Sequence, residues 1–205
     1  MKGLIQKDLY MIWRYGRSLL VMSGIFLAVS TVAQEQNYFF VVYPVLFAGV
    51  LPVTLISYEE RDGWNSLCDT MPLSRKTVVD ERYVMTFLCF LGMNVITLCV
   101  QGAVLLPKGR AEELTQLACT LPAVGLLAPA VMIPVTFRWG VEKGRLAYYI
   151  FIGVIVALGL IGASSLSNLS GEIAGAGMWA FPLAAIAAFG LSWLIAVKIY
   201  EKREL

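Results

Sequence analysis

The sequence contains no histidine, and its 205 residues carry few charges of either sign. The absence of imidazole removes the commonest general base and the commonest metal ligand. Charged residues make up only 15% of the chain, whereas soluble domains carry roughly 25%. Apolar residues make up 59%. We therefore expect a membrane protein that has no catalytic or metal site of its own.

Three further absences narrow the range of functions. The four cysteines, Cys68, Cys89, Cys99 and Cys119, show no C-x-x-C spacing and are interpreted as small apolar residues. The net charge of +2 and the lack of a basic cluster argue against a nucleic-acid partner. No G-x-x-x-x-G-K-[ST] phosphate loop occurs, so we expect no bound nucleotide or other cofactor in this chain. No linker interrupts the sequence, which predicts a single domain over residues 1–205.

Six apolar runs approach or exceed the roughly 20 residues that a helix needs to cross the hydrocarbon core. They cover residues 18–33, 38–57, 83–106, 114–137, 146–166 and 177–197. None contains Asp, Glu, Lys or Arg, which disfavours an ion-coupled transporter, because such proteins usually place ionisable groups at membrane depth. Asn94 and Gln101 are expected to hydrogen-bond between helices. The pattern predicts an all-α, polytopic membrane protein with six transmembrane helices.

The basic residues predict how these spans are oriented. Lysine and arginine collect in cytoplasmic loops, and with both termini in the cytoplasm all 16 basic residues except Lys108 and Arg110 lie on that side. The segments at 58–82 and 138–145 then form cytoplasmic loops. Residues 1–17 precede the first span, and their apolar side chains share one face of a helical wheel, which predicts an amphipathic helix in the membrane interface.

A stripe of small residues runs along the last span at every fourth position. Small side chains let helices approach closely in a membrane, so this stripe is a possible helix-packing seam. Packing between two copies of the chain and packing within one chain explain it equally well. The stripe consists of Ala180, Ala184, Ala188, Ser192 and Ala196.

The 58–82 segment contains a second amphipathic pattern. Asp62 can cap a short helix that Pro72 ends, and between them an apolar face repeats at helical spacing. Such a face lies either on the membrane surface or in a groove of a partner protein. Its members are Trp64, Leu67, Cys68 and Met71.

Three stretches of sequence together resemble one family of transporters. Glu59-Glu60-Arg61-Asp62-Gly63, followed by Met71-Pro72-Leu73-Ser74-Arg75-Lys76 and then Tyr83, resembles the first intracellular loop of the ABC-2 type permeases, the membrane subunits of bacterial ABC exporters. Residues 138–145 are similar to the Gly-x-Glu-Lys-x-Arg loop of the small six-span branch, and Lys7-Asp8-Leu9-Tyr10 fits the start of that branch.

The resemblance implies a half-transporter in the bacterial cytoplasmic membrane. It pairs with a second permease subunit, and a separate ATPase subunit holds Mg-ATP. The nearest similar systems export amphipathic or antimicrobial peptides. A non-transporting membrane scaffold or sensor subunit, and a self-sufficient channel or secondary transporter, are the alternatives. The resemblance also implies that the ATPase contacts Glu59, Glu60, Arg61, Trp64, Leu67, Cys68 and Met71 in the first loop, and Arg138, Glu142, Lys143 and Arg145 in the second.

Overall fold

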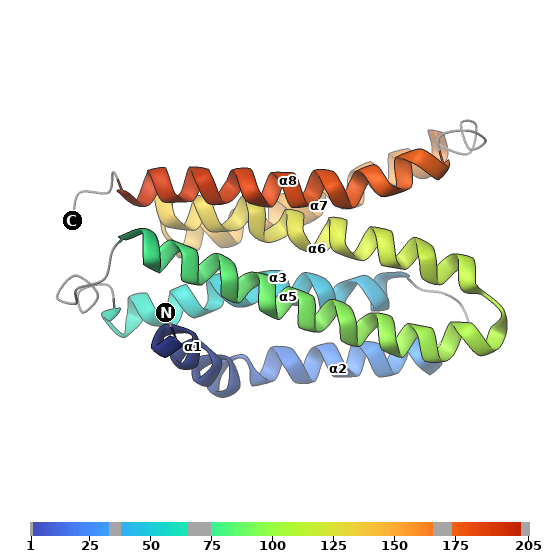
Figure 1. The fold of residues 1–205 in the computed structure, drawn as a ribbon, viewed down its shortest axis with the longest axis horizontal. Coiled ribbons are helices and arrows are strands. Elements are labelled where there is room, and N and C mark those ends of the chain that lie inside the picture. The colour runs from blue at the N-terminus through green and yellow to red at the C-terminus, as the bar shows by residue number, and fades with distance from the viewer. Residues whose placement is uncertain (1, 33–37, 65–74, 166–173, 202–205) are drawn as a thin grey trace.

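The computed structural model describes residues 2–32, 38–64, 75–165 and 174–201, with the side chains of 155–179 outside the described part. This part of the chain is helical and contains no strand, which confirms the all-α part of the prediction. The elements are α1 Lys2–Tyr15, α2 Arg17–Val32, α3 Tyr38–Arg61, α5 Arg75–Leu105, the short 3-10 helix η1 Leu106–Lys108, α6 Ala111–Trp139, α7 Val141–Ser165 and α8 Ala174–Glu201 (Figure 1).

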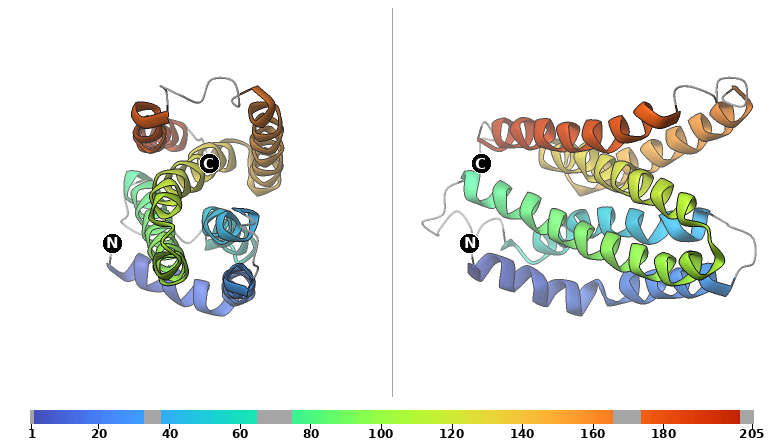
Figure 2. Two further views of the ribbon diagram at one scale, coloured as in Figure 1. Left: turned by 90° about the vertical axis from the view of Figure 1, so that its right-hand side faces the viewer. Right: turned by 45° about the vertical axis from the view of Figure 1, so that its right-hand side comes forward.

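The long helices run side by side as a bundle, and α1 lies across one end of it (Figures 1 and 2). The axes of α1 and α2 meet at a bend of 66°. On α1 the large apolar side chains of Leu9, Tyr10 and Trp13 are exposed, as expected of a helix that rests on a membrane surface. This arrangement agrees with the interfacial helix predicted for residues 1–17.

The centre of the bundle is α6, which packs against α3, α5, α7 and α8. A glycine in α6, Gly125, lets this helix approach α3 and α5 closely. A Cβ atom at Gly125 would lie 2.5 Å from both Phe90 of α5 and Val45 of α3. The missing side chain therefore lets three helices meet at one point, and Val45 and Phe90 belong to the buried core there.

Four helical segments among the described residues are long and apolar enough to cross a membrane. They are Phe39–Arg61, Lys76–Lys108, Ala111–Trp139 and Ala180–Tyr200, and the bent pair of α1 and α2 makes a fifth when it is counted as one span. Large apolar side chains are exposed along these helices, which suits lipid better than water. The helix at the fifth predicted span, α7, has 25 residues. Six spans thus remain a prediction.

The segments that carry most of the basic residues gather at one end of the bundle. In Figure 1 this is the left-hand end, where α1, the end of α3, the start of α5, the junction of α6 with α7 and the end of α8 lie. The turn through η1, which contains Lys108, lies at the opposite end. We call the first of these the basic end; that it faces the cytoplasm is a prediction from charge.

Labelling of single cysteines tests this orientation. In a variant without native cysteines, Lys108→Cys should react with an impermeant maleimide added to intact cells, whereas Lys143→Cys should react only after the cells are opened. Both side chains are exposed, so access to each depends on the side of the membrane. Labelling of Lys143→Cys in intact cells would reverse the predicted orientation.

The close approach at Gly125 predicts that even one added methyl group destabilises the bundle. Gly125→Ala should lower the free energy of unfolding by about 1–3 kcal/mol, as overpacking of a tight core usually does. Gly190→Ala in α8 is the matched control, because a Cβ there meets nothing within 4 Å and alanine favours a helix. Thermal unfolding in detergent micelles measures both; equal melting temperatures would contradict the packing described.

Candidate functional site

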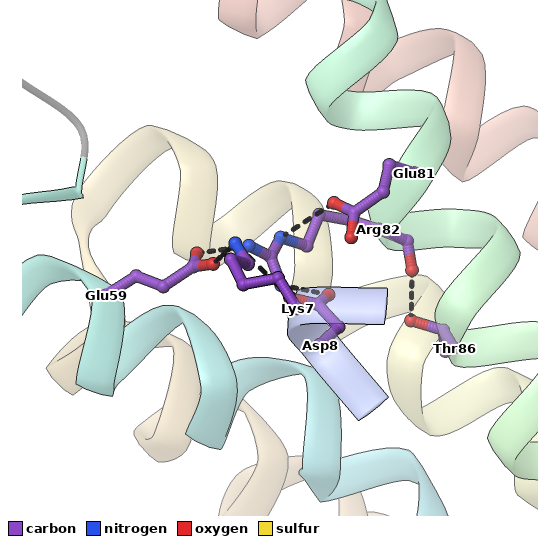
Figure 3. Close-up of polar contacts among 6 residues, drawn as sticks. All are labelled: Lys7, Asp8, Glu59, Glu81, Arg82 and Thr86. Atoms are coloured by element: carbon purple, nitrogen blue, oxygen red, sulfur yellow. Dashed lines mark hydrogen bonds and ion pairs between the residues drawn. The ribbon is translucent and has the colours of Figure 1, made fainter. Parts of the chain in front are cut away.

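Five charged side chains from three helices meet beneath the surface at the basic end (Figure 3). Lys7 and Asp8 come from α1, Glu59 from α3, and Glu81 and Arg82 from α5. Asp8 is fully buried, and Glu59, Glu81 and Arg82 are each no more than 5% exposed. We call these five residues the ion cluster.

Arg82 is the residue that joins the three helices. Its Nη1 donates to Asp8 Oδ2 at 2.7 Å, and its Nη2 donates to Glu59 Oε2. Lys7 Nζ lies 3.3 Å from Asp8 Oδ1 and also donates to Glu59 Oε1, so each of these carboxylates contacts both cations. One turn along α5, the Thr86 hydroxyl donates to the Arg82 carbonyl at 2.6 Å.

The cluster contains one more acid than base, since three carboxyl groups face one lysine and one arginine. Glu81 is the most weakly held of the three. Its Oε2 lies 3.5 Å from Arg82 Nε, and its Oε1 is buried and has no hydrogen-bond partner among the described residues. Glu59, by contrast, is held by Arg82 and by Lys7. The two glutamates should therefore contribute very differently to stability.

The cluster lies directly under the segment predicted to contact an ATPase. α3 ends at Arg61 in a turn, with the Asp62 amide bonded to the Tyr58 carbonyl and Gly63 at φ 69°. Glu60 and Arg61 are exposed there, and Lys7 Nζ stands 4.1 Å from the ring centroid of Trp64. Among those predicted contact residues that the structure describes, only Glu59 is buried, and its contacts with Lys7 and Arg82 hold the end of α3 in place.

The rest of the predicted apolar face, Leu67, Cys68 and Met71, lies outside the described residues, as does Pro72.

The second predicted loop, residues 138–145, takes a different form from the one expected. α6 continues to Trp139 and α7 begins at Val141, so Gly140 alone separates them, at φ 87°. Left-handed backbone of this kind favours glycine, which allows so abrupt a turn. Arg138, Glu142, Lys143 and Arg145 are all exposed on the two helix ends. They lie at the same end of the bundle as the ion cluster.

The small-residue stripe of α8 divides into two parts. Ser192 and Ala196 are buried against the neighbouring helices of the same chain, and the Ser192 hydroxyl donates to the Ala130 carbonyl at 2.6 Å. Ala180 and Ala184 are exposed, and Ala188 is half-buried. Packing within one chain thus accounts for the half of the stripe nearer the basic end.

Of the two polar residues expected to bond between helices, Gln101 does so, since its Nε2 donates to Ser30 Oγ of α2 at 2.9 Å. Asn94 Nδ2 is buried and has no hydrogen-bond partner among the described residues.

The sequence alone did not predict that Asp8, Glu81 and Arg82 would be buried. For Arg82 a signal existed, because it continues one helical stripe of α5 toward the basic end. That stripe is buried at every position: Arg82, Thr86, Phe90, Asn94, Thr97 and Gln101. A charge in phase with a buried stripe predicts an internal ion pair, since a buried charge needs a partner.

The long apolar helices of the bundle and the apolar surface that they expose define a multi-pass membrane protein. A family model described as ABC-2 family transporter protein matches residues 3–201, so the chain belongs to the ABC-2 family of transporter proteins. Its members are the membrane components of ABC transporters and carry no ATPase domain. No curated protein and no solved structure matches the chain.

Substitutions within the ion cluster should differ in cost by their partners. Glu59→Gln leaves the buried Arg82 and the partly buried Lys7 short of a carboxylate, and breaking a buried pair costs about 3–5 kcal/mol of unfolding free energy. Glu81→Gln removes the acid in excess and should cost about 1 kcal/mol or less. In detergent micelles, Glu59→Gln should therefore have a clearly lower melting temperature than Glu81→Gln.

Glu113→Gln is the control for these variants, because Glu113 pairs with the half-exposed Arg110 at the opposite end of the bundle. Exposed pairs contribute about 0–1 kcal/mol, so this variant should melt close to the parent. If Glu59→Gln and Glu81→Gln melt alike, the distribution of partners described for the cluster is wrong.

Proposed function

We propose that this chain is the permease subunit of an ATP-driven exporter, and that a separate ATPase subunit docks on its basic end. The observation that carries the proposal is the ion cluster, which lies immediately beneath Glu60, Arg61 and Trp64. Four of its charged residues are buried, and buried ion pairs commonly add little to stability, so we infer that the cluster serves to fix geometry. The residues of the ion cluster fix the end of α3 against α1 and α5, at the place where a docked partner would contact the chain.

Membership of the ABC-2 family supports an ABC ATPase as that partner. The chain has no phosphate loop of its own, so Mg-ATP would bind to the ATPase subunit. The docking surface would comprise the first-loop residues Glu60, Arg61, Trp64, Leu67, Cys68 and Met71, with Arg138, Glu142 and Lys143 of the α6–α7 junction beside them. These residues mix an apolar face with charges of both signs, as the rim and core of an interface do.

The remaining parts of the assembly follow from the family resemblance. A second permease subunit, identical or different, would complete the translocation path, and the exposed Ala180 and Ala184 of α8 offer one surface for it. The complex would lie in a bacterial cytoplasmic membrane with its basic end inside. Its substrate would be amphipathic, and a peptide of that kind is the candidate that the resemblance suggests.

A charge placed in the apolar face of the first loop tests the docking proposal. Leu67→Asp would force an ion into an apolar contact, so the ATPase should be lost from the tagged chain when it is purified from its native host. If Leu67 is one of the few interface residues that dominate binding, its loss should cost about 2 kcal/mol or more, roughly thirtyfold in affinity. ATP hydrolysis by the purified sample is the measurement, and mass spectrometry identifies the subunit with the phosphate loop.

Leu106→Asp provides the matched control, because Leu106 is exposed at the opposite end of the bundle. It should retain both the ATPase and its activity. If Leu67→Asp also retains the ATPase and its activity, the first loop is not the docking element. If no ATPase co-purifies even with the unaltered chain, the proposed function is wrong.

A further inference from the structure

A groove of about 580 Å³ opens on the face of the bundle between α2, α3 and α7. This volume lies within the range of about 300–1,000 Å³ that is usual for small-molecule sites. α3 contributes one helical stripe to it, which runs from Tyr58 near the basic end to Phe47 and Tyr43 deeper in the bundle. With a rise of 1.5 Å per residue, the 15 steps from Tyr43 to Tyr58 span roughly 22 Å.

The lining changes in character along that length. Near the basic end are Arg145 of α7, Thr54 and the stacked rings of Tyr15 and Tyr58, whose centroids are 4.2 Å apart. Farther along are Phe47, Val50 and Ile152, with Tyr43 in contact with Phe47 at 4.4 Å between centroids. One end of the groove is thus polar and the other is aromatic and aliphatic.

Arg145 is the one charged side chain among the described residues that line the groove. It is exposed, and no carboxylate of the described residues lies within ion-pairing distance of it. Its Nη2 donates to Ser57 Oγ at 3.3 Å, which leaves most of the guanidinium donors available. An arginine with free donors at the polar end of an apolar groove suits an anionic group.

The backbone holds Arg145 in this place. A Cβ atom at Gly144 would lie 2.1 Å from Thr136 Oγ1, so only glycine lets the start of α7 approach α6 so closely. Tyr148, one turn further on, donates from its hydroxyl to the Leu46 carbonyl of α3 at 3.3 Å. The two contacts fix α7 to α6 and to α3, and with them the width of the groove.

We propose that this groove binds a single-chain amphiphile with an anionic headgroup, the headgroup at Arg145 and the apolar chain along Val50, Phe47 and Tyr43. The inference deepens the proposed function, on which it rests, by naming the charge of the transported molecule. A cationic headgroup would meet Arg145 with no acid to offset it, because the described lining contains none. An uncharged amphiphile would leave the guanidinium unpaired beside it.

Photolabelling tests the assignment without an ATPase. The chain is reconstituted in phosphatidylcholine nanodiscs and labelled with a palmitate that carries a diazirine on its alkyl chain, and the labelled residues are mapped by mass spectrometry. Label should appear on the residues of α3 and α7 that line the groove, from Tyr43 on α3 to Ile152 on α7. Excess palmitate should compete, whereas an alkyltrimethylammonium of equal chain length should not.

Variants at Arg145 show whether the charge selects the ligand. Arg145→Gln should weaken competition by palmitate roughly tenfold, the loss expected for a charge-assisted hydrogen bond, and Arg145→Lys should restore part of it. Lys198→Gln removes an exposed cation at the same end of the bundle, outside the groove, and should change nothing.

Two results would overturn the proposal. One is labelling of the groove that responds equally to anionic and cationic competitors, or that is unaltered in Arg145→Gln. The other is a Tyr149→Cys variant that forms a disulfide-linked dimer while the groove remains unlabelled, because a second copy of the chain would then cover it. If the groove is labelled as expected but no ATPase co-purifies with the chain, the binding site is supported and only the proposed function is wrong.

Discussion

At the basic end, the positions of α1, α3 and α5 relative to one another depend on a single buried guanidinium. Arg82 is 3% exposed, and removing an ion of this kind from water costs several kcal/mol unless partners replace the water. Asp8 and Glu59 are those partners, and they come from α1 and α3. Helix α1 must therefore lie against α3 and α5, although its large apolar side chains Leu9, Tyr10 and Trp13 are exposed.

This constraint gives α1 a role that its amphipathic pattern alone does not require. A surface helix needs only an apolar face toward the lipid, yet α1 also buries Asp8 completely and stacks Tyr15 on Tyr58. Both contacts are made with the helices that flank the first loop. Because well-packed apolar residues often replace buried ion pairs without loss of stability, stability alone is a weak reason for the ion cluster. The fixed geometry that it gives the end of α3 is the stronger reason.

The sequence predicted the features that depend on composition and periodicity. The helix at each apolar run, the surface helix and the family all follow from local patterns. It did not predict the ion cluster, because Asp8, Glu59 and Arg82 are up to 74 residues apart and their meeting depends on how the helices pack. It also placed a loop at 138–145 where Gly140 turns one helix directly into the next, since charged residues at helix ends and in loops look alike in sequence. The sequence assigned Arg145 to a partner surface, and it did not indicate that Arg145 also lines the groove.

The ion cluster and the groove lie on different sides of one helix end. Successive residues of a helix point about 100° apart, and the neighbours Tyr58 and Glu59 of α3 face the groove and the cluster respectively. A tilt or rotation of this end must change both surroundings together, because Glu59 cannot leave Arg82 and Lys7 without turning Tyr58 against Tyr15. If the ATPase docks beside Arg61, as proposed above, a movement of this helix end would also move Tyr58, which lines the polar end of the groove. The ion cluster and the groove are thus connected directly through the end of α3, with no intermediate residues between them. Charges hold this helix end on one side, and stacked aromatic rings hold it on the other.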